Sequence, residues 1–209
     1  MKTRKNPLSI RIIYWLTQIS FWLFVLVFFA SIAFNIALQF EVLGNDLQLH
    51  TELPVETSYT EKGTLSLYDT VQEVEFVEAQ GKIHFINTDP RLAKWFGGLL
   101  LGVVGISLYI FLKFKQFIYN VYRGYIFERF NIRMLQNMAF GLVALWGFMI
   151  LYCRLYYYLI AKNLSFPHLI ISDEMDNYAF ILIIALLLWM LSHIFMHGVK
   201  LQDEQDLTV

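Results

Sequence analysis

Charged residues are scarce in this chain of 209 residues. Only 16% of its residues are Asp, Glu, Lys or Arg, whereas 57% are hydrophobic. A soluble domain carries about 25% charged and about 45–50% apolar residues, so the apolar excess predicts contact with lipid. The formal net charge is only −1, which gives no reason to expect direct nucleic-acid binding.

Cysteine and recognisable catalytic motifs are also nearly absent. The single cysteine, Cys153, cannot form an intrachain disulfide and excludes zinc sites built from several cysteines. The sequence has no glycine-rich nucleotide-binding loop and no Ser-His-Asp order, and its paired carboxylates lie in acidic loops. We therefore expect a protein that is not an enzyme and needs no cofactor.

Four long apolar runs account for the hydrophobic excess. Each can cross a hydrocarbon core, which needs about 20 residues, and lipid requires each to be helical because its backbone groups must be paired. The first run is too long for the apolar core of a signal peptide, so we interpret it as a retained span. The predicted fold is mainly α, a single membrane domain over residues 1–209 built as a bundle of four transmembrane helices. Its spans cover about residues 12–38, 92–112, 134–160 and 178–196.

The charges of the connecting segments predict the orientation. Residues 1–11 carry four bases and no acid, and residues 113–133 carry five bases and one acid. Residues 41–91 carry ten acids and three bases, and residues 161–177 carry three acids and one base. By the positive-inside rule, both termini and residues 113–133 lie in the cytoplasm, and the two acidic connections lie outside.

Residues 41–91 are predicted to form a small β-rich insertion outside the membrane. The stretches "GTLSLYDT" and "KIHFIN" alternate apolar and polar residues, as half-buried strands do. Residues 79–81 separate two such runs and suit a hairpin turn, so we expect a meander of about three short strands. The side chains expected to face inward are those of Leu65, Leu67, Ile83 and Phe85.

Two features of the predicted spans indicate helix packing and lipid contact. Gly98 and Gly102 are spaced as small-xxx-small with Gly105 one turn on, so another helix can approach closely. We favour packing inside the bundle, with a homo-oligomer as the alternative. Arg154 lies near the outer end of the third span, where an arginine extends to the headgroups; the alternative is a specific anion or lipid-headgroup contact.

His193 and His197 are the candidate metal ligands. Their spacing of four residues places both imidazoles on one helix face, as in many metal sites. The glutamate of an H-E-x-x-H helix is missing, because position 194 is isoleucine. We therefore favour interfacial histidines near a helix C-terminus and predict no metal.

Residues 113–133 are predicted to form an amphipathic cytoplasmic loop. Gly124 can break a helix and Asn131 can cap the next one. The mixture of aromatic residues and bases in this loop suits the headgroup plane, with the bases toward anionic lipid.

Residues 197–209 are predicted to form an acidic cytoplasmic tail. It either folds back on the basic loop through ion pairs, which we favour, or binds a partner through its apolar tip. The residues expected to carry interactions in loop and tail are Gly124, Phe127, Arg129, Asn131, Arg133, Asp203, Glu204, Gln205, Asp206, Leu207, Thr208 and Val209.

Two stretches together resemble a known family. Gly124-Tyr-Ile-Phe127 is followed by Asn131 and Leu135, and the chain ends in Gly198-Val-Lys-Leu-Gln-Asp-Glu-Gln-Asp-Leu-Thr-Val209. This resembles a bacterial family of four-span membrane proteins called domain of unknown function 2975, in which Glu is usual where Asp203 stands here. The resemblance covers the C-terminal half and implies topology rather than activity. Members of this family are often encoded beside small helix-turn-helix regulators of the Xre type. The resemblance therefore implies a regulator of this kind as a cytoplasmic partner.

Two classes of function fit these features. The first is a sensor or interaction protein of the bacterial inner membrane, which couples an envelope signal to a cytoplasmic partner. The alternative is a small transporter or permeation protein, or a structural membrane subunit. We favour the first class, because the spans hold almost no charge at mid-membrane, whereas the spans that line a substrate pathway usually carry charged residues there.

Overall fold

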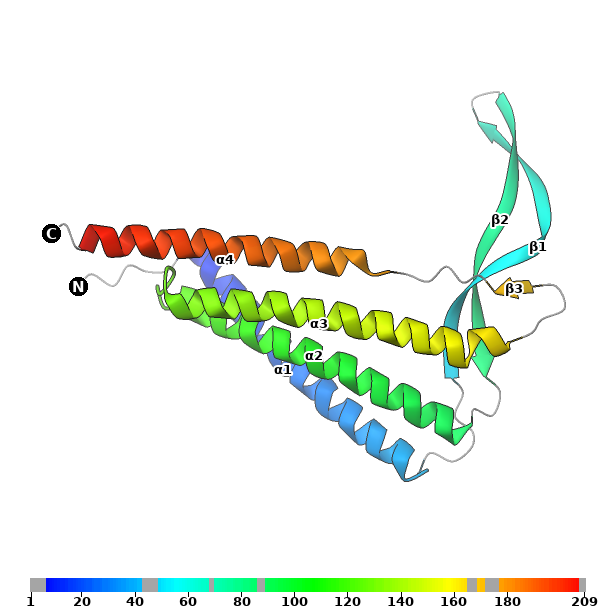
Figure 1. Cartoon of the computed structure of the whole chain (residues 1–209), viewed down its shortest axis with the longest axis horizontal. Coiled ribbons are helices and arrows are strands. Elements are labelled where there is room, and N and C mark those ends of the chain that lie inside the picture. Colours follow the sequence, from blue (N-terminus) through cyan, green and yellow to red (C-terminus); the bar gives the residue numbers. More distant parts are fainter. Residues whose placement is uncertain are drawn as a thin grey trace. The chain divides into compact units, whose positions relative to one another are not determined.

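The computed structural model describes residues 7–42, 49–67, 70–85, 89–164, 169–171 and 177–206. The described chain is mainly helical, and Figure 1 shows its four long helices. These are α1 (Leu8–Gln39), α2 (Pro90–Tyr122), α3 (Arg129–Leu159) and α4 (Ala179–Asp206). Each is long and apolar enough to cross a membrane.

The strands form one antiparallel sheet with the order β2-β1-β3. β1 (Leu49–Leu67) pairs with β2 (Thr70–Phe85), and the short β3 (Leu169–Ile171) pairs with the other side of β1. The predicted turn at residues 79–81 is wrong, because these residues lie inside β2 and pair with residues 53–55 of β1. The pairing continues without a break from Leu49↔Phe85 to Glu56↔Glu78, which leaves no place for a turn at residues 79–81. The side chains of Leu65, Leu67, Ile83 and Phe85 lie outside the described part.

The chain divides into two compact units. One unit comprises Met1–Val42, Lys94–Met149 and Tyr178–Val209; we call it the helical unit. The other comprises Leu43–Ala93 and Ile150–Asn177, and contains the sheet together with a 3₁₀ turn at Ala161–Asn163.

The helices extend beyond the predicted spans. α2 ends at Tyr122 and α3 begins at Arg129, so the predicted loop at residues 113–133 is helical except for residues 123–128. The predicted tail at residues 197–209 is likewise part of α4 as far as Asp206, and residues 207–209 lie outside the described part. The predicted spans stop where hydrophobicity falls, whereas a helix continues until its backbone hydrogen bonding is interrupted.

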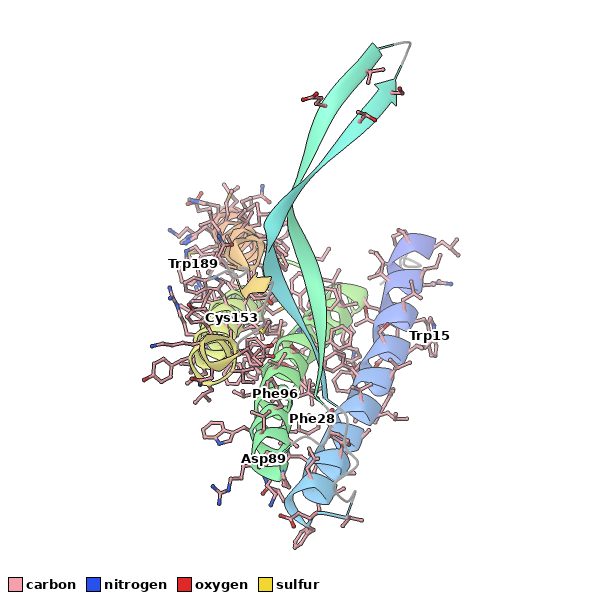
Figure 2. The ribbon with its side chains drawn as sticks, turned by 90° about the vertical axis from the view of Figure 1, so that its right-hand side faces the viewer. Trp15, Phe28, Asp89, Phe96, Cys153 and Trp189 are labelled. Carbon is pink, nitrogen blue, oxygen red and sulfur yellow. The ribbon has the colours of Figure 1, made fainter. Side chains whose placement is uncertain are left out.

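α1 packs antiparallel along α2. Near one end, the rings of Tyr14 and Tyr122 stack with centroids 4.4 Å apart. At the other end, the Lys94 Nζ lies 2.8 Å from the Glu41 Oε1. This hydrogen bond and the positive charge of Lys94 lower the pKa of Glu41 below its usual value. The opposite face of α1 is apolar and uncovered, and Trp15 points away from the other helices in Figure 2.

Glycines bring α2 and α3 close together, and Figure 1 shows these helices side by side. A Cβ at Gly102 would lie 2.6 Å from the ring of Phe148, and one at Gly141 would lie 2.7 Å from Ile110. Of the other two glycines in the predicted packing motif, Gly105 is in ordinary contact with α1, and Gly98 has no atom within 4 Å of its added Cβ. The tight approach is therefore at Gly102, and Gly98 takes no part in it.

Candidate functional site

α2 ends in a Schellman turn at Gly124. The amide of Tyr125 donates to the carbonyl of Asn120, and the amide of Gly124 donates to that of Val121, each over 3.0 Å. This pair of bonds requires the residue after the helix to be left-handed, and Gly124 has a φ of +90°. Glycine is the residue that takes this conformation without steric cost, so it fixes where α2 stops.

Asn131 holds the segment that follows this turn. Its side chain is completely buried, with 0% of its surface exposed. The Nδ2 donates to the carbonyls of Tyr125 and Ile126 over 2.5 and 3.0 Å, and the Oδ1 accepts from the Asn120 Nδ2 over 3.0 Å. Asn131 lies inside α3, so it does not cap that helix as predicted. It pairs backbone carbonyls of the preceding connection that would otherwise lack partners.

Phe127 packs the connection between α2 and α3 against α4. A Cβ at Gly198 would come 2.5 Å from the Phe127 ring, so only a glycine lets the ring lie this close to the helix. The Phe127 ring also lies 5.4 Å from the ring of Phe195, which lies 5.8 Å from Phe117 of α2. We call residues 123–128, with Asn120, Asn131, Phe195 and Gly198, the connection site.

An ion pair lies on the surface of the connection site. The Arg129 Nη2 is 3.4 Å from the Asp203 Oδ2, and both side chains are exposed. Exposed pairs contribute only about 0–1 kcal/mol, so this contact orients α3 and α4 more than it stabilises them. Asp203 belongs to helix α4, rather than to a separate tail. Arg133, Glu204 and Gln205 are exposed, and the side chain of Asp206 lies outside the described part.

The best-packed part of the helical unit adjoins the connection site. The largest fully buried side chains among the described residues are those of Asn131, Leu135, Met138 and Ser192. The Ser192 hydroxyl donates to the carbonyl of Trp189 over 2.6 Å, so its polar group is paired. Each apolar stretch that could cross a membrane buries at most 17% of its residues. Three of the four, those of Asn131, Leu135 and Met138, come from the first three turns of α3, so α3 gives the connection site a well-packed base.

Four apolar side chains on this rigid base remain accessible. Tyr125, Ile126, Phe127 and Phe130 each expose between 39% and 51% of their surface. We call these four residues the exposed patch. Exposed bases surround it, namely Arg123, Arg129 and Arg133. Clustered apolar residues with a polar rim are typical of a surface that another molecule covers.

The candidate metal and anion residues lie elsewhere. His193 and His197 are exposed on α4, and the ring of His193 lies 5.8 Å from that of Trp189. Within the described ranges, no three His, Cys, Asp or Glu side chains form a group that could hold a metal ion. Arg154 is exposed on α3, next to the buried Cys153.

Sequence patterns did not reveal Asn120 and Phe195 of the connection site, and they did not predict the contact that Gly198 makes. Phe195 and Gly198 contact Phe127, which lies far earlier in the chain, and Asn120 contacts Asn131 across the connection, so only folding brings them together. Asn120 did leave a signal, because an amide in the aromatic stretch "FIYNVY" needs a partner if it is buried.

Four long apolar helices make this chain a multi-pass membrane protein. The chain belongs to the family described as "Protein of unknown function (DUF2975)", whose sequence pattern matches residues 82–209, more than half of its length. The resemblance drawn from Gly124, Phe127, Asn131 and the C-terminal stretch is thereby confirmed. No curated protein and no solved structure matches the chain.

Proposed function

We propose that this protein is a non-enzymatic interaction protein of the bacterial inner membrane, and that the connection site binds a cytoplasmic protein. The observation that carries the proposal is the exposed patch, because it is apolar and stands on the best-packed part of the helices. A rigid apolar surface binds a partner without a large ordering cost.

The length of α2 supports a position of the patch beyond the lipid. The Lys94–Glu41 ion pair suits the polar edge of one leaflet. A hydrocarbon core of about 30 Å takes about 20 residues of helix, so it ends near Phe114. α2 continues to Tyr122, which places the connection about 12 Å farther out. At that distance, water and soluble proteins are the available neighbours.

The positive charges support a cytoplasmic location of this end. The described bases at the connection end are Arg11, Lys113, Lys115, Arg123, Arg129, Arg133 and Lys200. The positive-inside rule assigns such an end to the cytoplasm. The segment between α1 and α2, which contains β1 and β2, is then on the outside, because α1 crosses the membrane once. We propose that this outer segment receives the signal that the connection site transmits.

A soluble regulator suits the chemistry of the connection site. The bases around the exposed patch and the acidic end of α4 present both signs of charge, and complementary charges give specificity to protein partners. Anionic lipid repels Asp203 and Glu204, which favours a protein over the membrane surface as the occupant. A helix-turn-helix regulator, the partner class that the family resemblance implies, is our proposed partner.

Photo-crosslinking in the native host tests this function. With benzoylphenylalanine at Phe130, we expect a discrete adduct with one soluble cytoplasmic protein, identified by mass spectrometry. The matched control places the same residue at Leu186 of α4, which is more exposed than Phe130 (64% against 40%) but lies in the apolar stretch. Tyr125→Asp should abolish the adduct while the protein level stays constant. An adduct pattern at Phe130 equal to that at Leu186 would contradict the proposal.

A further inference from the structure

An aromatic cradle holds the ammonium group of Lys115. The Nζ lies 3.8 Å from the centroid of the Phe21 ring and 5.5 Å from that of Trp22. The two rings meet edge to face, with centroids 5.9 Å apart, and Phe21 is only 9% exposed. Ring faces attract a cation, so α1 holds the end of this long α2 side chain in place.

The described part of the chain supplies no carboxylate as a counter-ion for Lys115. Among the residues that the structure describes, neither Lys113 nor Lys115 forms an ion pair. An ammonium carries three N–H donors and no acceptor. Because the rings of Phe21 and Trp22 surround only part of the Lys115 ammonium, some of its N–H groups remain available for an anion. A partly dehydrated ammonium also binds an anion more strongly than an ammonium in water does.

The cradle lies at the depth of phospholipid headgroups. Lys115 is 21 residues after Lys94, which places it about 32 Å along the helix from the opposite polar edge. This is the edge of a hydrocarbon core of about 30 Å. Tryptophan is enriched at the same depth, as Trp22 would be here. The anion that this site meets is therefore the phosphate of a lipid in the leaflet on the connection side.

An apolar path leads from the cradle into the membrane. Trp22, Leu26 and Phe29 follow one another at intervals of four and three residues, so they lie on one face of α1. All three expose 64–68% of their surface. A phospholipid whose phosphate contacts Lys115 can lay an acyl chain along this stripe, which a free phosphate cannot do.

We propose that Lys115, Phe21 and Trp22 form a binding site for an anionic phospholipid of the inner leaflet. The Lys115 ammonium binds the phosphate, Phe21 and Trp22 fix the ammonium, and the stripe through Leu26 and Phe29 receives an acyl chain. This site is separate from the exposed patch, so it stands whether or not the connection site binds a protein.

Native mass spectrometry of the full chain in detergent, titrated with phosphatidylglycerol, tests the site. Lys115→Gln should weaken the tightest binding step about fivefold, because it removes the one lysine that contacts the bound phosphate, a contact of about 1 kcal/mol. Lys200→Gln, which removes an exposed lysine outside any aromatic cradle, should change this step less than about twofold. Lys115→Arg should retain binding, because it keeps the charge and the cation–π contact.

Further arms distinguish a bound phospholipid from a soluble phosphate and from general charge attraction. The wild type should bind phosphatidylglycerol more tightly than phosphatidylcholine, and Lys115→Gln should remove this preference. Inorganic phosphate in excess over the lipid should not displace it; displacement would show a soluble phosphate site and overturn the proposal. Equal weakening by Lys115→Gln and Lys200→Gln would also overturn it. If Lys115→Gln does not fold, Trp22→Ala is the test instead. This variant keeps the positive charge of Lys115 and must lower the affinity for phosphatidylglycerol.

Discussion

Replacing Asn131 by leucine should lower the free energy of unfolding by about 3 kcal/mol. Leucine has nearly the same volume, so the buried site stays filled, but three hydrogen bonds are lost. The carbonyls of Tyr125 and Ile126 and the amide of Asn120 are left without this partner. Each unpaired buried polar group costs about 1–3 kcal/mol, and the smaller figure applies where water reaches it.

The effect of this change can be measured against a matched control. Asn163→Leu removes one hydrogen bond, to the carbonyl of Leu159, at an exposed site of the 3₁₀ turn, and should change stability by about 0.5 kcal/mol or less. Unfolding of the two variants in detergent by increasing SDS, followed by circular dichroism, gives both values. Equal midpoints for both variants would show that Asn131 does not hold the connection together. Asn131→Leu should also weaken the adduct at Phe130, because the exposed patch loses its rigid base.

Replacing Gly198 by leucine should be the second most damaging change. A side chain there would meet the Phe127 ring, which must move away from α4 and lose its contact with Phe195. Overpacking of this kind costs about 1–3 kcal/mol. Replacing glycine with leucine also improves helix propensity by about 0.5–1 kcal/mol, which partly offsets the clash.

Gly147→Leu separates these two effects. Gly147 lies in α3 and has no atom within 4 Å of an added Cβ, so its replacement gains helix propensity without a clash. The difference between the two SDS midpoints should therefore correspond to about 2 kcal/mol, with Gly198→Leu the less stable variant. A Gly198→Leu variant as stable as Gly147→Leu would mean that Phe127 does not rest on α4.

The four helices could be predicted from the sequence because lipid imposes a length and an apolar composition on each span. Their ends could not. α2 continues through Lys113 and Lys115. On a hydrophobicity scale these lysines resemble loop residues, but lysine has a high helix propensity. It stops only at Gly124, where the backbone turns left-handed. The turn at residues 79–81 was wrong for a related reason: Gly81 suits a turn locally, but the pairing of β1 with β2 continues past it.

Only part of the connection site could be predicted from the sequence. Gly124 and Asn131 were singled out for their local properties, and the structure places Gly124 just after α2 and Asn131 in the first turn of α3. Asn131 nevertheless pairs with the preceding connection instead of capping its own helix. The contact of Phe127 with Gly198 depends on how α4 lies against the connection, which no local pattern reveals. The cradle of Lys115 likewise depends on the alignment of α1 with α2.

Cysteine labelling from one side of the membrane tests whether the connection site faces the cytoplasm and the outer segment faces the opposite side. Cys153→Ser removes the only natural cysteine. In that background, Glu204→Cys places one thiol at the exposed end of α4, and Glu73→Cys places one at an exposed position of β2. With a membrane-impermeant maleimide on intact spheroplasts, position 73 should be labelled at once and position 204 only after permeabilisation. Labelling of position 204 in intact spheroplasts, with position 73 protected, would contradict the orientation and the cytoplasmic role of the connection site.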